Sequence, residues 1–336
     1  MSPERSGALR LGIVGLGYIG TTVGAGFHRH PDATVAAVCD LDASLLASVG
    51  DRFGVDSDQR YDEYGEMVEA ASLDAVLVAT PHTLHYEQVL AALDADLHVY
   101  CDKPLTTDLE RARELVSRAD RSDRTLMVGY QRHLQRAFQR ARDRLTECGG
   151  ADWVTASITQ PWIESSRDSW RLDPALSGGG FLYDTGSHVL DGVLWASGLT
   201  PVSVDASMEF HDEGVDRLAH LDVTFASGAR GSFALNGDAA AVREHLHFWH
   251  PEGAVYVEGT EWGSRRVRFV DADSGEYAPY DDVGAQRSRA EAFVETVGEG
   301  TDPPATPRDA LRVTALTEAA YASARTGDRV EVDSSI

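Results

Sequence analysis

The sequence predicts an α/β domain with a doubly wound parallel sheet, followed by an α+β domain with a large, mainly antiparallel, open-faced sheet. Short apolar strands alternate with helix-like segments in the first third, and a glycine-rich turn directly follows the first strand. After about residue 130 the pattern changes to longer strands with hairpin-like connections. Domains usually hold ~100–200 residues, so the 336 residues suggest two, which we expect at 1–129 and 130–336.

Alternating strands and helices in the first third are typical of βαβ units and a parallel sheet. We expect strands at 9–14, 34–39, 75–79, 97–101 and 126–128, and helices at 18–30, 43–53, 84–93 and 107–120. The last of these helices begins with Thr107-x-x-Glu110, the pattern of a capping box.

The second region begins with a basic helix at 134–145 and a strand at 153–158, and Gly178–Gly180 open a helix that runs to about Trp195. Strands fill most of 202–270, with a hairpin turn at Ser227-Gly228. Helices at 287–297 and 307–325 close the chain. We expect one sheet face to lack helices, and because such a face usually finds a partner, we expect a homodimer or homotetramer.

The composition excludes some partners. Asp and Glu outnumber Lys and Arg by 54 to 30, giving a formal charge of −24, which repels nucleic acids and anionic membranes. Lys103 is the only lysine, a bias typical of proteins of salt-loving microbes, although a GC-rich genome would also favour arginine. Three cysteines without C-x-x-C spacing, and an N-terminus without a signal-peptide core, indicate reduced thiols in a cytoplasmic protein.

The glycine-rich turn reads Gly15-x-Gly17-x-x-Gly20 and opens the first helix. Glycines there let backbone N–H groups of the turn and of the first helical residues, Tyr18 and Ile19, approach a pyrophosphate. Together with its strand–turn–helix context, the motif predicts a Rossmann dinucleotide-binding domain.

Asp40 ends the second strand at the distance expected for the acid that binds the adenosine ribose. A carboxylate there repels a 2′-phosphate, and no Arg or Lys follows within ten residues. The sequence therefore favours NAD over NADP, while NADP stays possible. Asp42 is a weaker rival for the same role.

Three further segments complete a pattern: Ala79-Thr80-Pro81-His82, Asp102-Lys103-Pro104, and the run from Gly178 to His188. With the dinucleotide motif, they resemble the Gfo/Idh/MocA family of glucose–fructose oxidoreductase and inositol dehydrogenase, over nearly the whole chain. The family usually has Glu where this chain has Asp102, a conservative departure. The resemblance implies an NAD(P)-dependent oxidoreductase that acts on a hydroxyl carbon of a sugar, inositol or related polyol.

The resemblance also implies residue roles. Lys103 matches the family's active-site lysine, and Asp184 and His188 match its Asp-x-x-x-His pair, so these three are the candidate catalytic residues. The candidates for holding the cofactor are Lys103 and the segment that follows the strand at 75–79, namely Thr80, Pro81, His82 and His85. Besides the catalytic three, the candidate substrate contacts are Tyr130, Arg132, Trp162, Trp170 and Arg171, for each of which ordinary packing is an equal alternative.

The residue types suit alcohol oxidation, which needs a hydride acceptor and a base. Histidine suits the base, because its unperturbed pKa of ~6.5 lies near working pH. We expect His188 to take the proton, Lys103 to polarise the substrate oxygen, and Asp184 to position substrate or histidine from the same helical face. The roles of Lys103 and His188 are exchangeable at this stage.

A metal site is not expected. Asp184 with His188 would make a metal pair, but a third ligand of obvious spacing is missing. His245 and His247 share one face of a strand, but His250 points the other way, so we interpret these histidines as sheet or interface residues.

Other functions stay open within this pattern. A non-catalytic regulator that senses NAD or sugar would not need Lys103, Asp184 and His188 together. An NAD-using glycosidase of the same family would use the cofactor transiently and produce no net NADH. Reduction of an unsaturated substrate is a third alternative, which the Asp-x-x-x-His pair disfavours.

Overall fold

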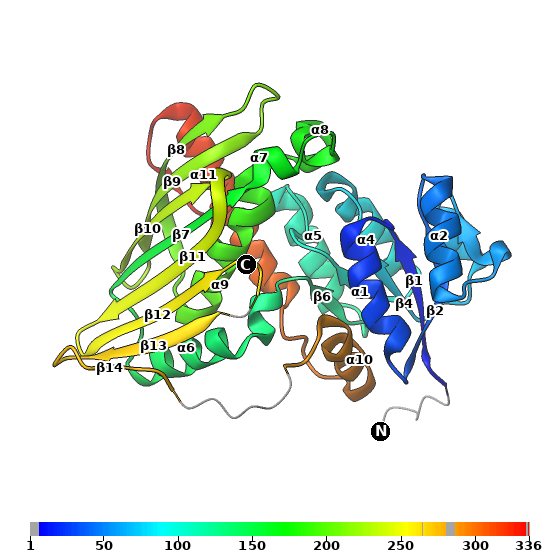
Figure 1. The fold of residues 1–336 in the computed structure, drawn as a ribbon, viewed down its shortest axis with the longest axis horizontal. Coiled ribbons are helices and arrows are strands. Elements are labelled where there is room, and N and C mark those ends of the chain that lie inside the picture. The colour runs from blue at the N-terminus through cyan, green and yellow to red at the C-terminus, as the bar shows by residue number, and fades with distance from the viewer. Residues whose placement is uncertain (1–6, 264, 280–285, 334, 336) are drawn as a thin grey trace. The chain divides into compact units, whose positions relative to one another are not determined.

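The computed structural model describes residues 7–263, 265–279, 286–333 and 335, and its chain divides into two compact units (Figure 1). The first unit is Met1–Thr106, Glu110–Gly129 and Arg287–Pro307; the second is Thr107–Leu109, Tyr130–Gln286 and Arg308–Ile336.

The expected second domain, 130–336, is therefore interrupted. Residues 287–307 pack with the first unit, because Phe293 sets its ring edge-on against Phe27 and Tyr100, with centroids 5.8 and 5.9 Å away. No motif or change of pattern in the sequence predicts that this segment returns to the first unit.

The first unit is built on a six-stranded sheet in the order β3-β2-β1-β4-β5-β6. Its strands are β1 (Leu9–Val14), β2 (Ala33–Cys39), β3 (Arg60–Tyr61), β4 (Ala75–Val78), β5 (His98–Cys101) and β6 (Leu126–Val128). All neighbours are parallel, which confirms the doubly wound sheet. The strand order reverses between β1 and β4, and ligands of such sheets bind beyond the carboxyl ends of the strands at this point.

The helices of the first unit are α1 (Tyr18–Arg29), α2 (Ala43–Phe53), α3 (Tyr64–Ala70), α4 (His85–Asp94), α5 (Leu109–Asp120) and α10 (Arg289–Glu299). The expected capping box of α5 is wrong: the helix begins at Leu109, so Glu110 lies too near its start. The first residue of α5, Leu109, belongs to the second unit, where the carboxylate of Glu318 accepts its N–H at 2.8 Å. None of the helices in the described ranges has both the length and the apolar character to cross a membrane.

The second unit holds a nine-stranded sheet in the order β14-β13-β12-β11-β7-β10-β9-β8-β15. Its strands are β7 (Trp153–Pro161), β8 (Pro201–Phe210), β9 (Asp216–Phe225), β10 (Arg230–Asn236), β11 (Asp238–His250), β12 (Gly253–Thr260), β13 (Arg266–Asp271), β14 (Glu276–Tyr277) and β15 (Val330–Glu331). Neighbours are antiparallel except β7 and β10, which confirms a mainly antiparallel sheet. The predicted turn joins β9 to β10, with Gly228 in the left-handed region at φ 89°.

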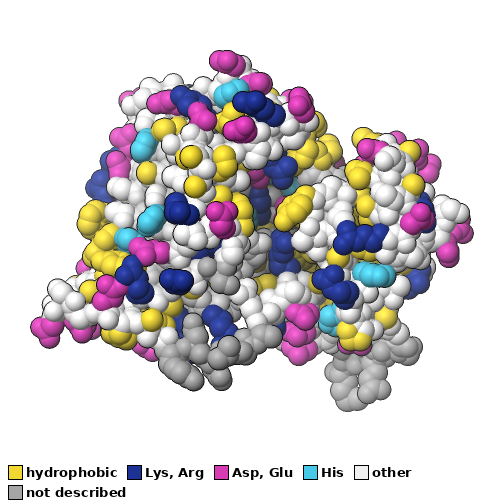
Figure 2. Space-filling model, viewed as in Figure 1, with side chains coloured by type: hydrophobic (Ala, Val, Ile, Leu, Met, Phe, Trp, Pro, Cys, Tyr) yellow, Lys and Arg dark blue, Asp and Glu magenta, His cyan; other side chains and the backbone are white. Residues whose placement is uncertain are grey.

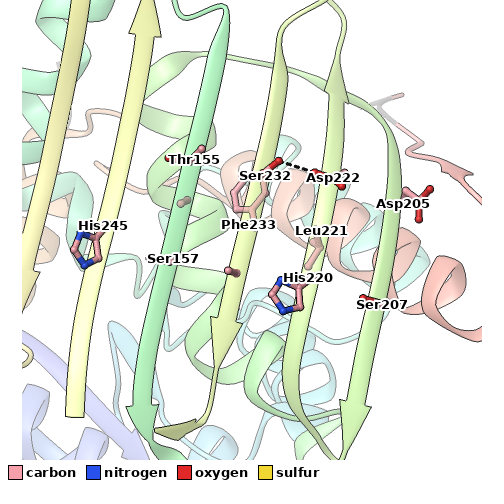
Figure 3. A pocket seen from close by; sticks show the side chains of 12 residues that line it. Thr155, Ser157, Asp205, Ser207, His220, Leu221, Asp222, Ser232, Phe233 and His245 are labelled. Carbon is pink, nitrogen blue, oxygen red and sulfur yellow. Dashed lines mark hydrogen bonds between the residues drawn. The ribbon is translucent and has the colours of Figure 1, made fainter. Parts of the chain in front are cut away.

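The two faces of this sheet differ. Leu246 and Phe248 of β11 are buried on the side where α6 (Arg136–Glu147) and α9 (Ser187–Ser197) pack, while the alternating residues of the strand face the other way. Figure 3 shows the side chains of that second face, which we call the open face. Its short polar side chains leave a hollow of ≈ 400 Å³ over β7, β8, β9, β10 and β11.

Candidate active site

The glycine turn of the first unit can admit an anion. Gly15 has φ 83°, and a Cβ there would lie 2.5 Å from the Ala79 carbonyl oxygen, so glycine is needed. A Cβ on Gly17 would meet nothing within 4 Å, and no side chain caps the start of α1. The free N–H groups of this helix start, at Tyr18 and Ile19, fit the pyrophosphate of a dinucleotide.

Asp40 and Asp42 have different partners. The Asp40 carboxylate accepts the Leu16 N–H at 2.6 Å and the Asp42 N–H at 2.9 Å, which fixes it beside the glycine turn. Asp42 caps α2, because its Oδ1 accepts the N–H groups of the second and third helical residues. Asp42 is thus occupied as a helix cap, and Asp40 keeps the position expected for a ribose contact.

His85 links the segments that follow β4 and β5. Its Nδ1 lies 2.7 Å from the Pro104 carbonyl oxygen, and its Nε2 lies 2.9 Å from the Thr80 carbonyl oxygen. Burial lowers the pKa of His85, whereas the two carbonyl oxygens that face its ring nitrogens act in the opposite direction. The Thr80 hydroxyl donates to the Gln88 side chain at 2.6 Å. His82 is also buried, in the short helix His82–Leu84 that begins after Pro81.

Lys103 follows β5 directly and is only 7% exposed. The Asp102 N–H donates to the Val78 carbonyl at 2.9 Å, which continues the β4–β5 ladder to the residue before the lysine. A Cβ on Gly129 would lie 2.7 Å from Asp102 Oδ1, so the segment after β6 also approaches closely. Lys103 thus lies where the carboxyl ends of three parallel strands meet.

Asp184 belongs to the second unit and lies in the π-helical turn Leu182–Gly186, which leads into α9. The expectation of one regular α-helix is corrected here, and such π-helical turns are frequent at functional sites. Asp184 Oδ2 accepts the indole N–H of Trp162 at 2.6 Å and Nε of Arg171 at 3.1 Å. The structure thus joins three of the predicted substrate residues around one carboxylate.

His188 lies just beyond that turn and is 7% exposed. Its ring packs edge-on against Tyr130 at 6.1 Å and tilted against Trp262 at 5.8 Å. The guanidinium of Arg171 stacks over the ring of the preceding residue, Trp170, at 4.6 Å from the ring centroid. Aromatic side chains therefore contact both members of the Asp-x-x-x-His pair, and a guanidinium contacts Asp184.

Arg132 does not fit its expected role as a substrate contact. Its buried guanidinium pairs with Glu244, which also pairs with Arg265. A fully buried ion pair is costly to break, so Arg132 is held in the interior. The next residue, His133, is also buried and binds Asp191 at 2.9 Å.

Two residues without a distinctive sequence signal hold the glycine cluster in place. The Gly180 N–H donates to the Tyr321 hydroxyl at 3.0 Å, and the Leu182 N–H donates to Asp216 Oδ2 at 2.9 Å. The Tyr321 hydroxyl donates to Asp216. Burial raises the pKa of Asp216 to about 6. Asp216 is one acid among 54 acidic residues, so only the fold reveals its position.

Comparisons with known proteins agree with this architecture. Residues 9–130 match the description "Oxidoreductase family, NAD-binding Rossmann fold", and residues 138–261 match "GFO/IDH/MocA C-terminal domain". The aldose-aldose oxidoreductase of Caulobacter crescentus, solved with glycerol, has a similar fold, with a TM-score of 0.83 at 24% identity over 96% of this chain and 99% of that one.

Two of the relatives are named as D-xylose 1-dehydrogenases. A D-xylose 1-dehydrogenase [NADP(+)] of Haloarcula marismortui is 31% identical over 72% of this chain and 65% of its own length. The alignment thus spans just under two thirds of that relative. A D-xylose 1-dehydrogenase (NADP(+)) 2 of Haloferax volcanii is 26% identical over 97% of this chain and its own full length (100%). With a dinucleotide-binding first unit, an open-faced second sheet and these matches, the chain belongs to the Gfo/Idh/MocA family of oxidoreductases.

Proposed function

We propose that this protein is a dehydrogenase that uses NAD, with NADP as the alternative cofactor, to oxidise a hydroxyl carbon of a sugar or polyol. The observation that carries the proposal is the burial of the only lysine, Lys103, at the carboxyl ends of β4, β5 and β6. Burying a lysine is costly, and an acidic protein that has shed lysine everywhere else retains it here. A role in the reaction explains that retention.

The cofactor is assigned to the first unit. We propose that the N–H groups at Gly17, Tyr18 and Ile19 hold the pyrophosphate and that Asp40 binds the adenosine ribose. The bound nicotinamide supplies the hydride acceptor. The Asp40 carboxylate supports NAD, whereas the names of both D-xylose 1-dehydrogenase relatives specify NADP, so the coenzyme is part of the test below. Thr80, Pro81, His82 and His85 are proposed to line the same site.

The chemistry of the substrate is assigned to three residues. Lys103 donates a hydrogen bond to the reacting oxygen and stabilises its alkoxide character. His188 accepts the hydroxyl proton, and the two roles are exchangeable. Asp184 positions the substrate, supported by its bonds from Trp162 and Arg171. Trp170 and Tyr130 are further proposed contacts, because aromatic faces stack on sugar C–H groups.

We further propose that the first unit is the cofactor domain and the second the substrate and assembly domain of a homo-oligomer. A cytoplasmic location is proposed because Cys39, Cys101 and Cys148 are all free thiols. A protein with a net charge of −24 is not expected to bind nucleic acid or an anionic membrane.

The test is NADH or NADPH formation at high salt with aldoses, inositols, sugar acids and diols. Wild type is compared with Lys103→Met and with Arg29→Met, which removes a charge from an exposed site on α1. We expect Lys103→Met to lower kcat at least ~100-fold while leaving cofactor affinity, measured by fluorescence titration, nearly unchanged. Arg29→Met should behave as wild type.

Full activity of Lys103→Met would refute the assignment of Lys103. Tight cofactor binding without net reduced cofactor on any alcohol would refute the dehydrogenase. Glycoside cleavage would then favour the NAD-using glycosidase, and binding alone would favour a sensor.

A further inference from the structure

Three side chains with metal-binding atoms meet on the open face. His245 and His247 are two apart on β11, so both project to the same side of the sheet. Glu258 of β12 stands directly opposite His245 in the strand register. Among the residues that the structure describes, these form the group of three His, Cys, Asp or Glu whose ligand atoms all lie within 4.8 Å of one another. The sequence analysis found no third ligand, because His250 points the other way; the fold brings Glu258 to the two histidines from the neighbouring strand.

The spacing suits coordination of one ion. Glu258 Oε1 lies 2.8 Å from His247 Nε2 and 3.6 Å from His245 Nδ1. A tetrahedral zinc ion with bonds of ~2.0–2.1 Å holds its ligand atoms ~3.3 Å apart. The distances of 2.8 and 3.6 Å lie on either side of that value, so small side-chain adjustments would let an ion enter between the three atoms.

Neighbouring residues orient these ligands. Arg268 donates to Glu258 Oε2 at 2.6 Å, which fixes the carboxylate and leaves Oε1 toward the two histidines. Tyr256 packs on the His247 ring at 4.2 Å, and Trp249 meets its edge at 5.6 Å. Partners that fix the orientation of metal ligands in this way are typical of binding sites.

We propose that His245, His247 and Glu258 bind a divalent transition-metal ion of the zinc class on the open face. Two imidazoles and one carboxylate suit Zn²⁺ or Co²⁺, whereas Mg²⁺ and Ca²⁺ prefer oxygen ligands throughout. Side-chain exposure of 49% at His245 and 30% at Glu258 leaves a coordination position for water. Figure 3 shows His245 on the strand beside Ser157, and Figure 2 shows histidine, acidic and basic side chains next to one another on the second unit.

The proposal is tested on the full, tag-free chain, stripped with a chelator and titrated without substrate. Zn²⁺ binding is followed by calorimetry, and Co²⁺ binding by the visible absorption that four- or five-coordinate cobalt acquires. The variants are His247→Ala, Glu258→Gln and the double variant His245→Ala/His247→Ala. The control is His220→Ala, which removes an exposed histidine on β9 of the same face.

We expect one ion per wild-type chain and per control chain. Loss of a direct ligand should weaken binding at least ~10-fold, because even the loss of a residue that orients a metal ligand costs ~10–100-fold. Zn²⁺ should raise the thermal midpoint of wild type and of the control but not of the double variant. Equal binding by wild type and the double variant, or an equal loss in His220→Ala, would overturn the proposal. Activity plays no part in the readout, so this result is independent of the dehydrogenase assignment.

Discussion

Asp216 shows how a single buried carboxyl can tie function to pH. Its oxygens accept the Leu182 N–H and the Tyr321 hydroxyl, so it fixes the chain just before Asp184. Burial raises its pKa to about 6 from the ordinary value of 3.8. The folded state therefore holds the proton more tightly than the unfolded state. The stability from this group is complete below the unfolded pKa and is lost as pH rises through about 6.

We predict that the stability of the wild type increases relative to that of the variant Asp216→Asn as pH falls from ~7 to ~5. The difference in free energy of unfolding should grow in favour of the wild type by ~1 kcal/mol across this window, from denaturant titrations at each pH. The comparison with the variant cancels the contributions of the other acidic residues. A difference that stays constant or shrinks on acidification would contradict the raised pKa.

The sequence identified individual residues unevenly. Lys103 could be singled out because it is the only lysine in the sequence, and the structure places it in a buried position at the ends of strands. Arg132 could not be judged from sequence, because its partner Glu244 lies far along the chain on β11. Tyr321 and Asp216 are distant in sequence, so the hydrogen bonds by which they hold Gly180 and Leu182 depend on the completed fold.

At the scale of elements, the glycine cluster sets how the turn of Asp184 begins. Gly178 adopts φ 74° at the end of the short helix Pro174–Ser177. A Cβ on Gly180 would lie 2.3 Å from the backbone oxygen of Asp216, and relieving that clash would require the backbone to shift. The π-helical turn thus starts where the backbone of Gly180 packs directly against the backbone of Asp216.

We predict that Gly180→Ala lowers the free energy of unfolding by ~1–3 kcal/mol, since overpacking forces backbone shifts of this cost. It should also reduce kcat through displacement of Asp184. The matched control is Gly65→Ala in α3, where a Cβ would meet nothing within 4 Å. There alanine should be neutral or stabilise by up to ~1 kcal/mol. Equal effects of the two substitutions would show that close approach at Gly180 is unimportant.

Regular elements were well predicted where the pattern was long. β1 and α2 have the expected bounds, because apolar periodicity and the Asp42 cap define them locally. The seven-residue α3 and two-residue β3 were missed, since segments so short carry little periodicity. The π-helical turn was also missed, because it depends on contacts with Asp216 and Tyr321.

At the scale of the molecule, charge and the open face both bear on assembly. Trp153 and Trp249 stack at 4.7 Å on that face, and Trp153 is 48% exposed. With a net charge of −24, two copies repel each other in dilute buffer. Salt shortens the screening length from ~10 Å at 0.1 M to ~3 Å at 1 M, so it should favour association.

We predict that light scattering finds a dimer or tetramer in molar salt and dissociation in dilute buffer. Trp153→Glu should remain monomeric at either salt concentration, because it places a charge in the exposed aromatic pair of the open face. Leu41→Glu, which changes an exposed apolar residue of the first unit, should assemble as wild type does. A monomeric wild type in molar salt would refute the expected homo-oligomer.

The return of residues 287–307 to the first unit has a consequence for biosynthesis. Phe27 and Tyr100 emerge early from the ribosome, but the ring that completes their aromatic cluster is Phe293. The nucleotide-binding half therefore cannot close its core until most of the polypeptide has been translated. A nascent chain cut off near residue 129 would expose those rings and become a substrate for chaperones rather than an independent module.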